Sequence, residues 1–243
     1  MLITSLDNDR IKKYIKLKQR KYREESKIYI VEGEHLVLEA YRTGMVIEVI
    51  LARDCVIPID SEKVYVTEEI LNAITTMENA PDVMALCKMP EEKVYGNKLL
   101  LLDGIQDPGN LGTIVRSAVA FNVDTIVLGK NTVDLYNPKT IRGAQGMNFH
   151  INIIERDLKE IIPELKSKEI PIYGTDVNVG DDAKILRDKD KEKYALIMGN
   201  EGQGISREIK DLCDTMLYIK MSEKVDSLNV GVATSILLYE LDK

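Results

Sequence analysis

Residues 103–116 read DGIQDPGNLGTIVR, and this stretch decides how the second half of the chain is expected to fold. It follows the apolar run KLLLLD at 98–103 and opens a segment with apolar residues at helical spacing. The apolar positions of that segment are Leu111, Ile114, Val115, Ala118 and Val119. A short apolar strand that leads into a core-facing helix is typical of a parallel α/β sheet. Ligands of such sheets bind beyond the carboxyl ends of the strands, so the loop after Asp103 is a candidate site.

Two polar residues of this helix, Asn110 and Arg116, lie outside its apolar stripe. This position leaves both side chains free at the mouth of the expected site. The alternative is that Asn110 caps the helix and that Arg116 is an ordinary surface charge.

The region from residue 96 onward alternates short apolar strands with helices. The expected strands are KLLLLD, DTIVLG, FHINII, IPIYGTD, YALIMG and MLYIK. The expected helices begin near Asn110, Pro138, Asp157, Asp181 and Ser206, and a last helix runs from Ser227 to Leu241. This alternation predicts a parallel sheet covered by helices on both faces. Residues 1–95 instead read as a small mixed α/β unit that ends in the polar, turn-rich segment PEEKVYGNK. The sequence therefore predicts two domains, at 1–95 and 96–243.

Charge is unevenly distributed along the chain. The net charge of −7 argues against a generic nucleic-acid binder, which neutralises phosphates with Lys and Arg. The first thirty residues nevertheless carry nine basic and four acidic side chains, and apolar residues between Asp7 and Lys21 recur near helical spacing. This pattern predicts one basic amphipathic helix, which is either a solvated surface or an arm that contacts RNA.

Cysteine and histidine spacing gives no sign of a metal site. The three cysteines and two histidines are isolated from one another, so we expect neither a zinc site nor a disulfide framework. The N-terminus has no apolar leader, and no uncharged apolar window is long enough to span a membrane. We therefore expect a cytoplasmic protein without membrane or metal partners.

The glycine-rich loop GNEGQGIS at 199–206 follows the expected strand YALIMG. Its glycines let the backbone approach a ligand closely, but their order fits neither a dinucleotide fingerprint nor a P-loop. Glu201 would repel a phosphate bound there. The loop therefore favours a ligand with a cation or hydroxyl groups.

The C-terminal run IKMSEKVDSLNVGVATSILLYEL at 219–241 is apolar nearly all round from Leu228 onward. A helix of this kind is buried on more than one side, either by insertion into the fold or at a subunit interface. On the simplest interpretation, Ser227 and Asn229 at its start are helix caps.

Taken in order, the N-x5-R loop, GNEGxGIS and SLNVxVA closely resemble motifs of the SpoU-type (TrmH-like) 2′-O-ribose RNA methyltransferases of the SPOUT superfamily. The resemblance covers the whole chain, because IVEGEHLVLEA is similar to that family's N-terminal RNA-substrate-binding domain and NPKTIRGAQGMNFHI to a further segment. Two departures are Glu223, where the family commonly has Gly, and Gly231, where it usually has Ser.

The resemblance implies an α/β catalytic domain with a deep C-terminal trefoil knot that holds S-adenosylmethionine. It also implies a homodimer formed through the knot and the last helix. The implied activity is 2′-O-ribose methylation of RNA, most often large-subunit ribosomal RNA in members with this N-terminal domain. The alternatives are a tRNA substrate, or a non-catalytic RNA-binding or ribosome-assembly protein of the same fold.

The family's functional residues are carried over to this chain position by position. The implied catalytic residues are Asn110, Arg116, Glu201, Ser227 and Asn229. The implied donor-binding residues are Gly199, Asn200, Gly202, Ile219, Met221 and Leu228. A guanidinium keeps its proton at neutral pH and therefore cannot accept another as a base. We expect Arg116 instead to clamp a phosphate and stabilise developing negative charge. Glu201 would fix its loop or pair with Arg116.

Overall fold

The computed structural model describes residues 2–242, and its internal contacts divide the chain into two compact units. The first unit runs to Glu91 and also includes Asp134–Phe149. The second contains Glu92–Val133 and the chain from His150 onward. Residues 134–149, which were expected in the second domain, thus pack with the N-terminal unit.

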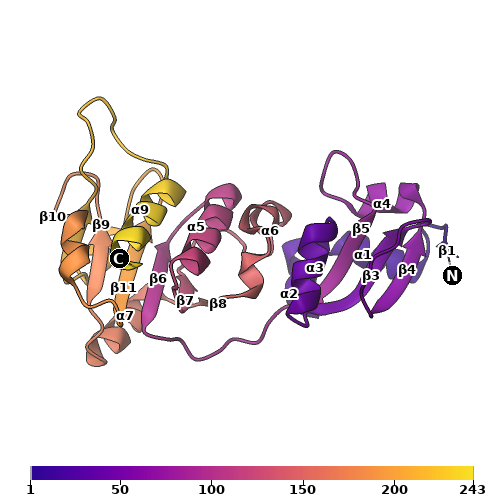
Figure 1. Cartoon of the computed structure of the whole chain (residues 1–243), viewed down its shortest axis with the longest axis horizontal. Coiled ribbons are helices and arrows are strands. Elements are labelled where there is room, and N and C mark those ends of the chain that lie inside the picture. The colour runs from indigo at the N-terminus through magenta and orange to yellow at the C-terminus, as the bar shows by residue number, and fades with distance from the viewer. Residues whose placement is uncertain (1, 243) are drawn as a thin grey trace. The chain divides into compact units, whose positions relative to one another are not determined.

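The second unit is built on a parallel seven-stranded sheet, in the order β10-β12-β9-β11-β6-β7-β8 (Figure 1). Its strands are β6 (Lys98–Asp103), β7 (Thr125–Leu128), β8 (Asn152–Glu155), β9 (Ile172–Thr175), β10 (Asp181–Asp182), β11 (Tyr194–Gly199) and β12 (Thr215–Tyr218). Every pairing between these strands is parallel. The predicted α/β class with a parallel sheet is therefore confirmed.

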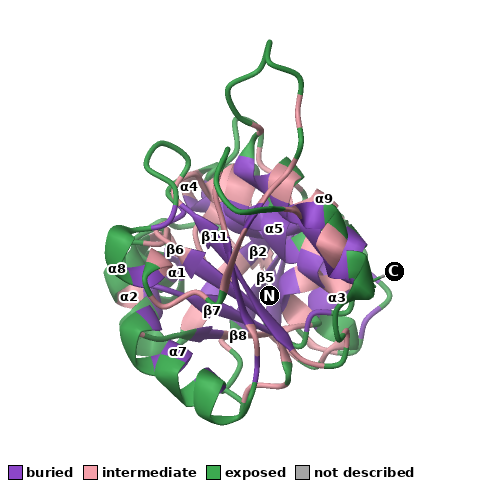
Figure 2. Ribbon diagram, turned by 90° about the vertical axis from the view of Figure 1, so that its left-hand side faces the viewer, coloured by how far each residue is buried: buried purple, intermediate pink, exposed green. Residues whose placement is uncertain are grey.

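Helices cover both faces of this sheet. They are α5 (Pro108–Ala120), α7 (Leu158–Ser167), α8 (Arg207–Lys210) and α9 (Val230–Asp242). Leu99 and Leu101 of β6 pack in one core cluster with Leu165 of α7. In Figure 2 the strands β6, β7 and β11 are mostly buried, whereas α7 and α8 expose their outer faces. None of the described helices combines the length and apolar character that a membrane crossing needs.

The last helix, α9, packs against α5 and β11 of its own chain. Insertion into the fold therefore accounts for much of its apolar surface. Gly231 lies at the contact with α5, where a Cβ atom would come within 3.0 Å of the Thr113 side chain. A serine here would require the Thr113 side chain to give way by a few tenths of an ångström. Val232 and Tyr239 of α9 remain exposed.

Three element predictions for this unit differ from the structure. The expected helix near Asp181 is instead the short strand β10 followed by a 3₁₀ helix, η2 (Ala183–Asp188). The expected strand FHINII begins only at Asn152, because Met147–Phe149 forms another 3₁₀ turn, η1. The last helix begins at Val230 rather than Ser227.

The first unit contains a mixed sheet in the order β1-β4-β3-β5-β2. Its strands are β1 (Leu2–Ile3), β2 (Ile28–Glu32), β3 (Val46–Ala52), β4 (Glu62–Val66) and β5 (Val83–Lys88). Its helices are α1 (Asp9–Lys16), α2 (Arg20–Ser26), α3 (Glu34–Arg42), α4 (Glu68–Ile74) and α6 (Pro138–Ala144). Strand β5 runs antiparallel to both of its neighbours, so the mixed α/β character expected from the sequence is present.

The predicted basic amphipathic helix is present as α1, but it ends at Lys16 instead of continuing to Lys21, because the chain breaks between α1 and α2. The guanidinium of Arg23 is almost fully buried and donates to the carbonyls of Leu17, at 2.7 Å, and Lys18, at 2.8 Å. These carbonyls follow the last turn of α1 and have no helical partner there. Arg23 also forms an ion pair with Asp134. The buried arginine thus stabilises both the break and the return of segment 134–149.

Candidate active site at the carboxyl end of the parallel sheet

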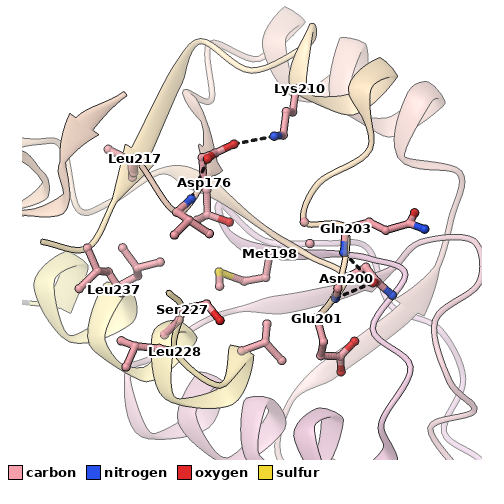
Figure 3. A pocket seen from close by; sticks show the side chains of 18 of the residues that line it. Asp176, Met198, Asn200, Glu201, Gln203, Lys210, Leu217, Ser227, Leu228 and Leu237 are labelled. Carbon is pink, nitrogen blue, oxygen red and sulfur yellow. Dashed lines mark hydrogen bonds and ion pairs between the residues drawn. The ribbon is translucent and has the colours of Figure 1, made fainter. Parts of the chain in front are cut away.

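A cavity of about 470 Å³ lies beside the carboxyl ends of β9 and β11 and the start of α9 (Figure 3). All six residues predicted to bind the methyl donor line it: Gly199, Asn200, Gly202, Ile219, Met221 and Leu228. Glu201 and Ser227, predicted to be catalytic, line it as well. Residues from two distant sequence motifs are therefore brought together around one space.

The glycine-rich loop forms a tight turn over the end of β11. Asn200 and Gly204 exchange backbone hydrogen bonds of 3.0 and 2.9 Å, and the Asn200 side chain accepts from the amide of Gly202 at 2.9 Å. A Cβ atom on Gly199 would lie 2.1 Å from the backbone of Gly204. Only glycine at position 199 allows this close return of the chain.

Glu201 joins the glycine-rich loop to the loop before α5. Its carboxylate accepts hydrogen bonds from the amides of Gln106, at 3.2 Å, and Asp107, at 3.3 Å, and from Asn110 Nδ2, at 3.0 Å. Burial by itself would raise the pKa of Glu201, but the hydrogen bonds outweigh it and lower the pKa below its ordinary value. Glu201 therefore fixes the loop as a carboxylate.

Asn110 does not cap its helix, so that alternative is wrong. Asp107 is the cap, and its carboxylate accepts from the Asn110 amide at 2.9 Å. The Asn110 side chain instead donates to Glu201 and accepts from Asn229 Nδ2 at 2.8 Å. Asn229 Oδ1 in turn accepts from the amides of Gly231 and Val232, so Asn229 caps α9, as the simplest interpretation predicted.

Three of the five predicted catalytic residues thus form one hydrogen-bonded chain: Glu201, Asn110 and Asn229. Ser227 is exposed and lines the cavity. Arg116 is exposed on α5, does not line the cavity, and has no ion-pair or hydrogen-bond partner among the described residues. The suggested pairing of Glu201 with Arg116 is absent from the ion pairs within residues 2–242, and fixing the loop is the role that the contacts support.

Two further polar residues line the cavity, Asp176 and Lys210, and the sequence motifs do not point to them. Asp176 directly follows β9, as Gly104 follows β6, so the rule for strand ends would have found it. Lys210 lies at the end of α8, and only the tertiary structure brings it to the cavity.

The cavity has the size and chemistry that a nucleoside-containing cofactor needs. Its volume falls within the range of small-molecule sites, and its walls include apolar side chains such as Met198, Leu217 and Leu237. The close-packed glycine turn adds backbone polar groups along one side. S-adenosylmethionine fits this combination. Within the described part of the chain, no three His, Cys, Asp or Glu residues are grouped to hold a metal ion.

Comparison with known proteins assigns the chain to a family. The model of the SpoU rRNA methylase family matches residues 97–239, and that of an MRM3-like substrate-binding domain matches residues 8–85. The chain belongs to the SpoU rRNA methylase family. The predicted family and the predicted methyltransferase class are thereby confirmed.

Individual relatives match over nearly the full chain. The 23S rRNA (guanosine(2553)-2′-O)-methyltransferase RlmP of Bacillus subtilis is 40% identical, covering 98% of each chain. The SpoU methyltransferase AviRb of Streptomyces viridochromogenes, solved with the cofactor AdoMet, is 25% identical, with a TM-score of 0.85 and 97% of each chain covered. An AdoMet-bound rRNA methyltransferase from Sinorhizobium meliloti is 26% identical, with a TM-score of 0.84, covering 99% of this chain and 97% of its own.

Proposed function

We propose that this protein transfers a methyl group from S-adenosylmethionine to a ribose 2′-hydroxyl of large-subunit ribosomal RNA. The observation that carries the proposal is the hydrogen-bonded chain of Glu201, Asn110 and Asn229, which lies next to a cavity suited to the donor. The two relatives solved with AdoMet support S-adenosylmethionine as the donor. The name of the Bacillus subtilis relative supports 23S ribosomal RNA as the substrate. We expect the target to be the guanosine equivalent to the one in that name.

The donor supplies an activated methyl group on a sulfonium, so the protein chiefly has to orient the ribose and stabilise charge. Arg116, which has no partner among the described residues, would bind a phosphate next to the target ribose and stabilise the developing alkoxide. Asn110 and Asn229 would position the ribose, since their amides are already fixed by Glu201 and by the start of α9. Ser227 would contact the ribose from the cavity wall.

The N-terminal domain, residues 1–95, would select the RNA, and residues 96–243 would form the catalytic domain. The match to a substrate-binding domain at residues 8–85 supports this division. The arm of α1 and α2 contributes exposed lysines that have no carboxylate partner among the described residues: Lys13, Lys16, Lys18 and Lys27. Phosphates are their natural partners, despite the negative total charge.

The C-terminal segment would form a deep trefoil knot, and two copies would associate through the knot and α9. Exposed Val232 and Tyr239 support the association, because they leave apolar surface on a helix that is otherwise packed in its own chain. We further propose that the protein acts in the cytoplasm, where ribosomal RNA is found, without a metal or membrane partner.

Transfer of labelled methyl groups tests the function directly. The wild-type protein and Arg116→Ala are incubated with labelled donor and with total RNA from cells that lack the modification, and 2′-O-methyl groups are mapped. One new site in 23S rRNA, missing with Arg116→Ala, is the expected result. A site in tRNA would reassign the substrate. A protein that binds the donor but methylates no RNA would instead be the non-catalytic RNA-binding or ribosome-assembly protein.

A further inference from the structure

One wall of the cavity carries an ion pair that the proposed mechanism does not use. Asp176 Oδ2 lies 2.5 Å from Lys210 Nζ, and both residues line the cavity. Asp176 comes directly after β9, and Lys210 is the last residue of α8. Figure 3 shows the pair on a different side of the cavity from Glu201. The pair is therefore placed to contact a part of the ligand other than the reacting group.

The hydrogen bonds of Asp176 leave part of its carboxylate available. Oδ1 accepts from the amides of Val177, at 2.7 Å, and Asn178, at 3.3 Å, which holds the carboxylate in position. Oδ2 accepts only from Lys210 among the described residues. A carboxylate has about four acceptor positions and an ammonium three donor positions. The pair thus keeps one acceptor, on Oδ2, and two donors, on Nζ.

The pair has no net charge to offer a ligand. Burial by itself would raise the pKa of Asp176, but the hydrogen bonds from Lys210 and from the two amides lower it below its ordinary value. Asp176 is therefore ionised at neutral pH, and Lys210 neutralises it. An ammonium approaching Asp176 meets the charge of Lys210, and a carboxylate approaching Lys210 meets the charge of Asp176. A neutral group that both donates and accepts hydrogen bonds satisfies both partners.

A ribose has such a group in its two adjacent hydroxyls. We propose that Asp176 and Lys210 bind the ribose hydroxyls of the methyl donor's adenosine, one hydroxyl donating to Asp176 Oδ2 and the other accepting from Lys210 Nζ. This inference rests on the proposed function, because it takes S-adenosylmethionine as the ligand of the cavity.

Binding measurements on the full chain test the proposal with three nucleosides. Calorimetry compares S-adenosylhomocysteine, 5′-methylthioadenosine, which lacks the amino-acid end, and a methylthioadenosine without its 2′- and 3′-hydroxyls. The variant is Asp176→Asn, whose amide oxygen still accepts from the amides of Val177 and Asn178. Its Nδ2 cannot accept from a hydroxyl. The matched control is Asp214→Asn, which alters another lysine–aspartate pair, Lys166 with Asp214 at 2.7 Å, away from the cavity.

The expected result is a selective loss of affinity. Asp176→Asn lowers the affinity for S-adenosylhomocysteine and for methylthioadenosine alike, by about tenfold to a hundredfold. This is the effect expected from the loss of a hydrogen bond to a charged group. The variant leaves the weak binding of the dideoxy analogue unchanged, and Asp214→Asn binds all three like the wild type.

Three results would overturn the proposal. If Asp176→Asn bound the nucleosides with wild-type affinity, Asp176 would not contact the ribose hydroxyls. If only S-adenosylhomocysteine bound more weakly, the pair would contact the amino-acid end of the donor. If the dideoxy analogue lost as much affinity as the other two nucleosides, the role of the Asp176–Lys210 pair would be purely structural. If the wild-type protein binds none of the nucleosides, the proposed function itself fails, and the inference falls with it.

Discussion

The side chain of Asn229 donates a hydrogen bond of 2.8 Å to Asn110 Oδ1, although 119 positions separate the two residues in the chain. Asn110 belongs to the loop and helix after β6, and Asn229 to the start of the last helix. The bond therefore joins the first and third sequence motifs, while Glu201 adds the second through Asn110 Nδ2. A substitution at any one of these three residues therefore changes the hydrogen bonding of the others.

Replacing Asn229 by Ser separates its two roles. A serine still caps α9, but it has no amide to donate to Asn110. We expect thermal stability near that of the wild type and methyl transfer reduced by about tenfold or more, the loss of one positioning hydrogen bond. Asn229→Ala also loses the cap and should cost about 1 kcal/mol of stability. Full activity of Asn229→Ser would show that its bond to Asn110 has no role in catalysis.

Glu201→Gln should loosen the glycine-rich loop at neutral pH. A neutral amide accepts less strongly than the carboxylate from the amides of Gln106 and Asp107, so we expect weaker binding of S-adenosylhomocysteine in calorimetry. The folded-state pKa of Glu201 lies below its ordinary value of 4.5, so its ionised form stabilises the fold above that pH. This stabilisation is lost as the pH falls through the folded-state pKa. The difference in melting temperature between wild type and variant should therefore shrink below about pH 4.5. A difference that stays constant into acid would mean that the charge contributes nothing.

Arg116→Lys tests the proposed phosphate clamp. Lysine keeps the positive charge but cannot form two parallel hydrogen bonds to one phosphate. We expect methyl transfer to fall by at least about tenfold, with affinity for the donor unchanged because Arg116 does not line the cavity. Since Arg116 is exposed, the melting temperature should not change. Near-full activity of the lysine variant would count against the clamp.

Gly199→Ala should disrupt the donor cavity. The added methyl would lie 2.1 Å from the backbone of Gly204, so the glycine-rich loop must move away from β11. We expect S-adenosylhomocysteine binding to be lost and stability reduced by about 1–3 kcal/mol, as for overpacking in a core. Gly202→Ala is the matched control for stability, because its nearest contact would be an ordinary 3.5 Å and the loop need not move. An equal loss of stability in both variants would refute the steric explanation.

Val232→Glu tests the proposed association of two copies. Val232 is 47% exposed on α9, so a charge there should leave the isolated chain folded but weaken an apolar interface. Sedimentation should show a shift from dimer to monomer. Val56→Glu changes a residue that is 84% exposed in the first unit and should leave the dimer intact. A wild-type protein that sediments as a monomer would exclude the proposed dimer.

The sequence predicts the structure best where the pattern is local. The strand KLLLLD and the helix that follows it were predicted from apolar spacing, because burial of one face imposes that spacing within the element. Prediction failed where distant contacts decide the local conformation. The predicted single basic helix breaks because Arg23 binds the carbonyls of Leu17 and Lys18 and pairs with Asp134, far along the chain.

The sequence by itself determined the α/β class and the family and pointed to most of the residues that line the candidate site, since motifs and periodicity are written directly in the order of residues. Only the tertiary structure decided which of those residues meet. Asn110 proved to be a link between Glu201 and Asn229 rather than a helix cap, and Lys210 was brought to Asp176 from a separate helix. Hydrogen bonds depend on distances of about 3 Å between atoms, and chain order does not specify such distances until the sheet places the strand ends side by side.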